Sequence, residues 1–310
     1  TTQSLPGPRH DAISNIGNPS MIRIAHVVFS LNPGGLENGI VNLCKNLDRT
    51  RFDTSICCLE EEGAFARRLS GVCKVNALHR RQGFSLATAR RLRTFLLKEK
   101  PDIVHSHNLG PLLYSWLATK MGDPWIRVHG EHGVLPPPDF TPRKRLLYKL
   151  TLPGCGAITT VSESLRQILR QKGFPAERIV AIRNGVDTER FIPGDPSVAR
   201  NALGIPNDRK IVGIVGRLAQ NKGHAVLLKA FEGLSDRIQN ATLLLVGDGP
   251  ERSSLTEMAA KMRLAHRIVF AGHTDNPVPY YQAMDLMALP SLFEGLSNVV
   301  LEAMACGIPV

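Results

Sequence analysis

Residues 22–47 read IRIAHVVFSLNPGGLENGIVNLCKNL, and they contain the pattern that repeats along the chain. The short apolar run at 22–30 is rich in β-branched residues and predicts a buried parallel strand. The turn NPGG at 32–35 follows, and residues 36–47 have a helical pattern. A strand, a glycine turn and a helix in this order let the backbone approach a phosphate at the helix N-terminus. The full Gly-x-Gly-x-x-Gly pattern is absent, so this turn alone is weak evidence for a phosphate site.

Strands and helices alternate in the same way through most of the chain, which predicts parallel sheets with helices on both faces. The pattern runs to residue 182 and restarts at residue 210, so the expected fold class is α/β with two Rossmann-like doubly wound domains. The predicted strands are 22–30, 52–59, 74–78, 103–107, 125–129, 157–161, 179–182, 210–215, 241–246, 268–271 and 286–290, with another opening at 308–310. The predicted helices are 36–47, 64–69, 86–100, 111–121, 143–150, 163–172, one ending near 234, 251–262, 278–284 and 298–306.

The turn residues PGDP at 193–196 mark the best candidate for a domain boundary. We therefore expect an N-terminal domain at 21–192 and a C-terminal domain at 193–310. Residues 1–20 are rich in Ser, Pro, Gly and Asn without an apolar core, which is typical of a disordered leader rather than a signal peptide. A doubly wound domain does not usually end as a strand begins, so the C-terminal domain is expected to be truncated.

Composition is ordinary for a soluble globular protein, with 43% hydrophobic and 21% charged residues, but the charge is unevenly placed. Residues 21–190 contain 26 Lys and Arg against 15 Asp and Glu, whereas residues 191–310 contain 11 of each. The net charge of +11 therefore belongs to the first domain. A basic face attracts polyanions or an anionic membrane surface, although scattered cations are more often simply solvated.

The cluster Arg143, Lys144 and Arg145 is followed by leucines and a tyrosine, as in a short basic amphipathic segment. It predicts a possible contact with an anionic membrane, and no nucleic-acid partner is expected. No apolar run reaches the length of a membrane-spanning helix. The expected location is the cytoplasm, with peripheral association at the inner face of the membrane.

Cysteine and histidine usage predicts no metal site. Six cysteines occur without a Cys-x-x-Cys pair, which indicates reduced, mostly buried thiols. His105, His107, His129 and His132 are close in sequence, but they have neither nearby thiolates nor a His-Glu-x-x-His helix. No cofactor is expected either.

The segment FEGLSNVVLEAMACG near the end carries two glutamates eight positions apart, Glu294 and Glu302. If Ser297 caps a helix, the N–H groups of residues 296–298 converge on one spot, which is an anion site. Glu302 then lies about one turn along the helix, where it can accept hydrogen bonds from sugar hydroxyls. A phosphate site beside a carboxylate indicates a nucleotide-sugar site. The alternative is a buried amphipathic helix whose glutamates are merely exposed.

Two cations follow the first strand of the second domain. Arg217 comes directly after that strand and Lys222 lies five residues on, so both can clamp a diphosphate, Arg as a fork and Lys as a point charge. The alternative for each is ordinary solvation in a loop.

Seven motifs together resemble a known family. They are GGLE at 34–37, HSH at 105–107, HG at 129–130, NGVD at 184–187, GRL at 216–218 with KG at 222–223, GDGP at 247–250, and the segment from EG at 294–295 to EA at 302–303. From residue 21 to its end the chain resembles the retaining, nucleotide-sugar-dependent glycosyltransferases of the GT-B fold, the large fourth family or group 1 glycosyl transferases. It looks nearest to the bacterial members linked to exopolysaccharide assembly.

The resemblance implies roles for particular residues. Arg217 and Lys222 would hold the leaving diphosphate, Glu294 would contact the donor sugar, Glu302 would bind the ribose, and His129 would lie near the reacting sugar. His129, Arg217, Lys222 and Glu294 are thus the implied catalytic set. The implied donor-binding residues are Gly34, Gly35, Gly216, Arg217, Lys222, Gly247, Gly249, Glu294, Gly295, Leu296, Ser297, Asn298 and Glu302.

The resemblance also implies a reaction. A sugar would pass from a nucleoside-diphosphate donor to a polysaccharide or polyprenyl-linked acceptor, with retention of configuration. Fixed cations and helix N–H groups would stabilise the charge that develops on the diphosphate, so no metal is needed. Two alternatives remain open, a nucleotide-sugar epimerase of the same fold and a non-catalytic protein that binds polyanions or membranes.

Overall fold

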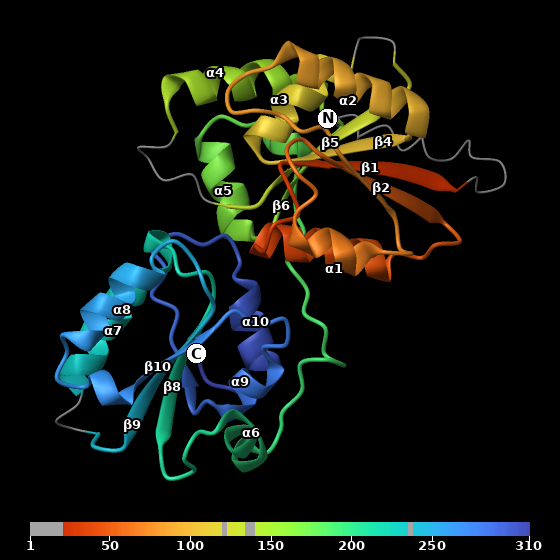
Figure 1. The fold of residues 1–310 in the computed structure, drawn as a ribbon. Helices are drawn as coiled ribbons and strands as arrows, with labels where there is room; N and C mark the ends of the chain where they lie inside the picture. Colours follow the sequence, from red (N-terminus) through yellow and green to blue (C-terminus); the bar gives the residue numbers. More distant parts are fainter. Residues whose placement is uncertain (1–20, 120–122, 134–139, 235–237) are drawn as a thin grey trace, which may run out of the picture. The chain divides into compact units, whose positions relative to one another are not determined.

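The computed structural model describes residues 21–119, 123–133, 140–234 and 238–310. The leader predicted for residues 1–20 lies outside the described residues. The chain divides into two compact units (Figure 1). The first unit comprises Thr1–His132, Thr141–Thr159 and Arg170–Val180, and the second comprises Gly133–Phe140, Thr160–Leu169 and Ala181–Val310. The predicted boundary after residue 192 stays a prediction.

The first unit is built on a seven-stranded sheet, counted over the described residues, with the order β3-β2-β1-β4-β5-β6-β7. Strand β1, the third in this order, pairs in parallel with both β2 and β4, as expected for a doubly wound sheet. Its strands are β1 (Ile22–Val28), β2 (Phe52–Cys58), β3 (Lys74–Ala77), β4 (Ile103–His107), β5 (Ile126–Glu131), β6 (Ala157–Thr160) and β7 (Ile179–Ala181).

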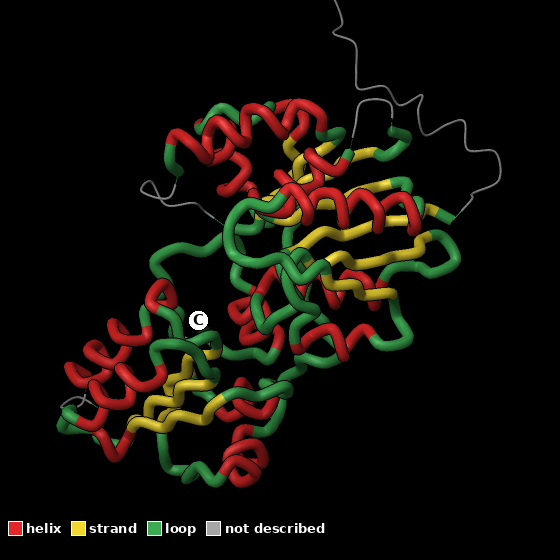
Figure 2. The backbone as a smooth tube through the Cα atoms, turned by 45° about the horizontal axis from the view of Figure 1, so that its top comes forward, coloured by secondary structure: helices red, strands yellow, loops and turns green. Residues whose placement is uncertain are grey.

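Helices cover both faces of this sheet (Figures 1 and 2). The helices are α1 (Gly35–Asn46), α2 (Leu86–Glu99), α3 (Leu109–Ala118) and α4 (Pro142–Thr151), with short 3₁₀ helices at Ala64–Leu69, Leu152–Gly154 and Ala176–Arg178. Helix α5 (Glu163–Gln171) follows β6 in the chain, and most of its residues are assigned to the second unit. Alternate residues of a strand point to opposite faces. Val28 therefore packs with Ile40 of α1 in one apolar cluster, whereas Val27 packs with Leu92 of α2 and Tyr114 of α3 in another.

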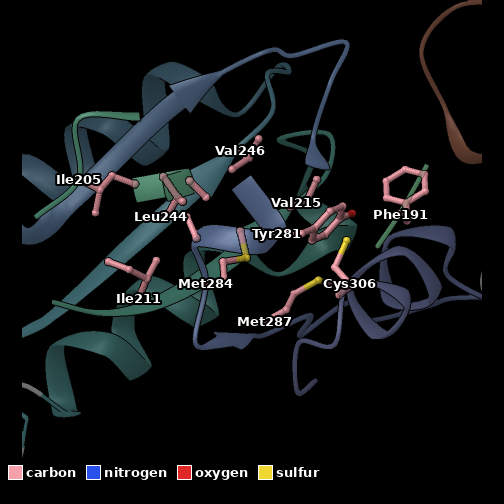
Figure 3. Close-up of a cluster of buried hydrophobic side chains, with 13 residues drawn as sticks. Phe191, Ile205, Ile211, Val215, Leu244, Val246, Tyr281, Met284, Met287 and Cys306 are labelled. Atoms are coloured by element: carbon pink, nitrogen blue, oxygen red, sulfur yellow. The ribbon is translucent and has the colours of Figure 1, made fainter. Parts of the chain in front are cut away.

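The second unit has a smaller sheet of parallel strands in the order β10-β9-β8-β11. Its strands are β8 (Lys210–Val215), β9 (Ala241–Val246), β10 (Ile268–Gly272) and β11 (Leu286–Met287). Its helices are α6 (Pro196–Leu203), α7 (His224–Leu234), α8 (Arg252–Ala260), α9 (Val278–Ala283) and α10 (Asn298–Ala305), with 3₁₀ helices at Gln220–Lys222 and Ala265–Arg267. One apolar cluster joins β8 and β9 to α7 and α8, and a second joins the other face to α9 and α10 (Figure 3).

The fold class predicted from the sequence is confirmed, and most elements lie within a few residues of their predicted bounds. The strand predicted at 308–310 is wrong, because this segment takes no strand conformation and only Met287 N donates to Pro309 O, at 2.9 Å. The strand predicted at 286–290 is limited to its first two residues. None of the helices in the described part of the chain is long and apolar enough to cross a bilayer.

Helix α6 escaped the sequence analysis, which treated residues 193–196 only as a boundary. Asp195 caps this helix by accepting a hydrogen bond from Ser197 N at 2.8 Å, and Pro196 occupies its first position. The buried Arg200 then fastens α6 to the end of α9 and to the residue before β11. Its Nε donates to Ala283 O at 2.9 Å, and its Nη2 donates to Asp285 Oδ2 at 2.8 Å.

We predict that Arg200→Ala lowers the free energy of unfolding by about 2–3 kcal/mol, because it removes the buried guanidinium that bonds Ala283 and Asp285 and leaves Asp285 with Ile211 N as its buried donor. Lys210→Ala is the matched control, since Lys210 Nζ lies 3.7 Å from the same carboxylate but its side chain is 64% exposed. The control should cost less than about 1 kcal/mol. Urea titration measures both variants, and equal losses would show that Arg200 does not anchor α6.

Candidate functional site

The centre of the candidate site is an ion pair between Lys222 and Glu294, two residues that are far apart in the sequence. Lys222 Nζ donates to Glu294 Oε1. The two side chains are 25% and 28% exposed, so the pair is reachable from solvent without being fully hydrated. The carboxylate fixes the position of the ammonium group, so an anion that displaces the carboxylate finds the cation in place. The carboxylate itself can accept hydrogen bonds from hydroxyl groups.

Glycine permits the backbone contact that brings this pair together. Gly223 follows Lys222 with a φ of 72°, and a Cβ at this position would collide with the carbonyl oxygen of Pro290. Next to this contact, Leu292 N donates to Asn221 O at 2.9 Å. The Lys222 turn and the segment that precedes Glu294 are therefore docked through their main chains.

The turns after β8 and β9 are also in main-chain contact. Gly216 and Gly247 have φ values of 155° and 134°, and a Cβ on Gly247 would collide with Gly216 O. A Cβ on Gly249 would likewise collide with Leu218 O. Glycine is required at 247 and 249 because the two turns at the carboxyl ends of neighbouring strands touch there, whereas at 216 only the positive φ favours glycine. Arg217 lies in the first of these turns with an exposed side chain.

Helix α10 begins at Asn298, as predicted, and Ser297 occupies its N-cap position. The Ser297 side chain makes no capping hydrogen bond in the described structure, so it does not occupy the first-turn N–H groups. These groups point out of the N-terminus, where the helix dipole favours an anion. Asn184 of the NGVD motif fixes the preceding turn, because its Nδ2 donates to Leu296 O at 3.0 Å.

Glu302 is buried on α10 rather than exposed, and the bland alternative of a surface glutamate is therefore wrong for this residue. Tyr281 of α9 donates a hydrogen bond to Glu302 Oε2 at 2.7 Å. Burial, followed by the neighbouring carboxylate, raises the pKa of Tyr281. Figure 3 shows the Tyr281 ring within the apolar cluster that includes Phe191 and Cys306, so its hydroxyl is a fixed donor that orients Glu302.

The candidates in the first unit are a glycine turn and a histidine. Gly34 is the N-cap residue of α1 and Gly35 is its first residue. Gly34 has extended backbone, and a Cβ at this position would meet the Glu37 carboxylate, which therefore lies over the turn. A diphosphate that approached this turn would have to displace that carboxylate.

His129 is fully buried, with partners at both ring nitrogens. Its Nδ1 lies 3.2 Å from Ser106 Oγ, and its Nε2 lies 3.3 Å from Glu131 Oε2. Tyr148 of α4 donates to the same carboxylate oxygen at 2.8 Å. Burial, followed by the charge of Glu131, raises the pKa of Tyr148. Both ring nitrogens of His129 therefore have buried hydrogen-bond partners. The contact of His129 with a reacting sugar stays a prediction.

The sequence has a second basic cluster on α2, at Arg90, Arg91 and Arg93, and its contacts differ from those of the cluster at 143–145. Arg93 is tied to Asp123 by a hydrogen bond of 2.8 Å and therefore has a structural partner. Helix α4 instead presents Arg143 and Arg145 to solvent beside Leu146 and Leu150, which are 55% and 53% exposed. Exposed cations and exposed leucines therefore lie on the same helix, as the sequence predicted.

Sequence reasoning missed two residues that complete the site. Tyr281 orients Glu302, but a tyrosine in an apolar helix gives no signal of that role. Pro290 receives the backbone of Gly223, and the space around this glycine shows the contact, whereas its sequence gives no signal of it.

Two family models match the chain. Residues 33–190 match the model described as Glycosyltransferase Family 4, and residues 197–310 match the model described as Glycosyl transferases group 1. Among curated proteins, the chain is 30% identical to the putative glycosyltransferase EpsF of Bacillus subtilis, covering 94% of this chain and 79% of that protein. It is 29% identical to the D-inositol 3-phosphate glycosyltransferase of Mycobacterium bovis, of which it spans 57%.

Solved structures share the fold. Anabaena HepE in complex with UDP and glucose aligns with a TM-score of 0.81 and 24% identity, covering 93% of this chain and 80% of that one. Sucrose-phosphate synthase from Thermosynechococcus elongatus aligns with a TM-score of 0.78 and 21% identity, covering 93% and 80%. At these identities the likeness concerns the fold alone, which is a GT-B fold.

We predict that Gly223→Ala destabilises the protein clearly more than Gly204→Ala. Both glycines have a left-handed φ, 72° and 69°, and alanine in that conformation costs about 1–2 kcal/mol. Only Gly223 also approaches another backbone, whereas nothing lies within 4 Å of a Cβ at Gly204. Unfolding midpoints in urea compare the two, and equal losses would contradict the close approach between Gly223 and Pro290.

Proposed function

This chain belongs to the group 1 glycosyltransferases, and we propose that it moves a sugar from a nucleoside diphosphate to a polysaccharide or lipid-linked acceptor, with retention of configuration and without a metal ion. The observation that carries the proposal is the Lys222–Glu294 pair, which the Gly223 turn sets against the segment leading to α10. Cation, carboxylate and helix N-terminus are the groups that a sugar diphosphate needs. UDP and glucose bound to the structurally similar Anabaena HepE support a donor of this class.

In this proposal the donor replaces the internal ion pair. Lys222 turns to the diphosphate and Glu294 to the sugar hydroxyls, so each charge exchanges one partner for another. Arg217, exposed in the neighbouring turn, adds a second cation to the diphosphate. Cleavage of the glycosyl–phosphate bond builds negative charge on the leaving group, and fixed cations stabilise that charge where it develops.

Glu302 accepts hydrogen bonds from the ribose, with its carboxylate oriented by Tyr281. The leaving phosphate itself takes the proton from the acceptor hydroxyl, which keeps both substrates on one face of the sugar and retains its configuration. The two cations supply the charge that a metal ion would otherwise supply, which is the basis for proposing metal independence. His129 is proposed to lie near the reacting sugar.

The likeness to EpsF supports an acceptor in exopolysaccharide assembly. An epimerase of the same fold would need a proton-transferring acid and base at the sugar. Here Glu294 is engaged by Lys222 and Glu302 by Tyr281, which suits binding of a donor better than acid–base work.

A panel of nucleoside-diphosphate sugars tests the proposed function. With one donor and a membrane extract as the acceptor source, the protein should release free nucleoside diphosphate in the presence of a chelator. Lys222→Met should abolish most of this release, and Lys229→Met, on the exposed side of α7, should not. The proposal fails if no donor is consumed, or if an epimerised sugar nucleotide accumulates instead.

We predict that Glu302→Ala weakens donor binding by about 1–3 kcal/mol through the loss of ribose hydrogen bonds. Tyr281→Phe should weaken it less, because the carboxylate remains while its orienting partner is lost. Glu257→Ala, at a side chain that is 70% exposed on α8, controls for charge. Calorimetric titration with the donor measures the affinity of all three variants. Unchanged affinity in Glu302→Ala would show that Glu302 does not contact the ribose.

We further propose that α4 docks on the anionic inner face of a membrane. Exposed Leu146 and Leu150 beside Arg143, Lys144 and Arg145 give it the apolar and basic surfaces of an interfacial helix.

Replacing Arg143, Lys144 and Arg145 with glutamine should weaken binding to phosphatidylserine vesicles by about 3 kcal/mol, at about 1 kcal/mol for each cation. Added salt should weaken the wild type in the same direction. The control variant has glutamine at Lys74, Lys210 and Lys261, whose side chains are 76%, 64% and 73% exposed. It loses the same number of positive charges away from α4. Equal losses in the two triple variants in vesicle sedimentation would contradict a specific role for α4.

A further inference from the structure

Three histidines lie side by side on one face of the central strands of the first unit. His26 on β1 is the register partner of His105 on β4. His107 stands two residues beyond His105 and therefore points to the same face of β4. His129 is the register partner of Ser106 and belongs to the opposite face. The histidines that are close in sequence thus separate into two groups, and His26 joins one of them from a distant part of the chain.

The geometry of this group suits a metal ion. One nitrogen from each of His26, His105 and His107 lies within 4.8 Å of the others. His26 Nδ1 lies 3.1 Å from His107 Nε2, and the ring centroids of His105 and His107 are 4.1 Å apart. Two nitrogens bound to one tetrahedral Zn²⁺ at about 2.0–2.1 Å are about 3.3 Å apart, so small movements would suffice.

Two of the ring nitrogens in this group have no hydrogen-bond partner among the described residues. They are His26 Nε2 and His105 Nε2, and both are shielded from solvent. A buried polar atom without a partner costs free energy, and an ion held by His105 through Nε2 would remove that cost for this atom. His26 faces His107 through Nδ1, so His26 Nε2 would keep its cost. Burial lowers the pKa of His26 to about 4 and lowers that of His105 and His107, so all three rings are neutral at pH 7. Neutral imidazole is the form that ligates metals.

Neighbouring residues leave room for the group and orient it. Gly130 is the register partner of His107, and a Cβ there would lie 3.2 Å from both His105 Nε2 and His107 Nδ1. A side chain at Gly130 would therefore fill the space beside the rings. His132 Nε2 lies 3.0 Å from His107 Nδ1. Such a bond at the far nitrogen fixes the ring orientation of a ligating histidine.

We propose that His26, His105 and His107 bind one divalent transition-metal ion, such as Zn²⁺, through their ring nitrogens, with His132 as the positioning residue behind His107. A ligand set made of imidazoles selects Zn²⁺, Co²⁺, Ni²⁺ or Cu²⁺ over Mg²⁺ and Ca²⁺, which prefer oxygen. The ion would join β1 to β4 and stabilise the first unit. It takes no part in the proposed sugar transfer, whose cations Arg217 and Lys222 belong to the second unit.

Titration of the untagged, chelator-stripped full chain with Zn²⁺ and Co²⁺ tests the proposal. Calorimetry should give one ion per chain with micromolar or tighter affinity, and Zn²⁺ should raise the unfolding temperature while Mg²⁺ leaves it unchanged. His105→Asn should lower the affinity by about tenfold or more. His273→Asn, at a side chain that is 53% exposed, should bind as the wild type does.

The Co²⁺ absorption spectrum locates the ion even if His105→Asn does not fold. Nitrogen ligands alone should give ligand-field bands without thiolate charge transfer. Absence of binding by the wild type, unchanged affinity in His105→Asn, or thiolate bands that place the ion on cysteines would each overturn the proposal. Diphosphate release by the stripped protein is independent of these outcomes, so the metal site and the proposed transferase function fail separately.

Discussion

The ion pair between Lys222 and Glu294 is the interaction on which the candidate site depends. It joins a turn after β8 to a segment after β11, and it exists because Gly223 lets the first backbone rest on Pro290. Each member of the pair holds the other at the place where a donor is proposed to bind. The pair keeps two charges partly desolvated at modest cost, and a ligand that offers a diphosphate to the lysine and hydroxyls to the glutamate replaces both partners at once.

Around this pair, main-chain and side-chain contacts hold the loops that form the candidate site. Gly247 and Gly249 let neighbouring turns touch, and Asn184 holds the turn before α10. Tyr281 orients Glu302 from within the apolar cluster. Tyr281 and Glu302 are therefore buried, whereas Arg217 is exposed. This is the arrangement expected where binding residues sit on loops supported by a scaffold.

Periodicity and turn residues predicted the parallel α/β fold and most elements, because buried parallel strands and amphipathic helices leave strong local patterns. The same reasoning missed α6, whose signal at 193–196 is shared by a turn and a helix start. Motifs brought Lys222, Glu294 and Glu302 into one hypothesis. They did not show the partners Tyr281 and Pro290, since a contact across elements leaves no local pattern. Strand register likewise separated His129 from His105 and His107, which sequence proximity had grouped together.

The measurement that tests this account most directly compares the wild type with Glu294→Gln in two titrations, one with the nucleoside diphosphate and one with the matching sugar nucleotide. If Glu294 holds Lys222 in the empty site and turns to the sugar on binding, the variant should bind the diphosphate more tightly and the sugar nucleotide more weakly. Shifts of the same sign, or no shift in either titration, would contradict the exchange of partners at this ion pair.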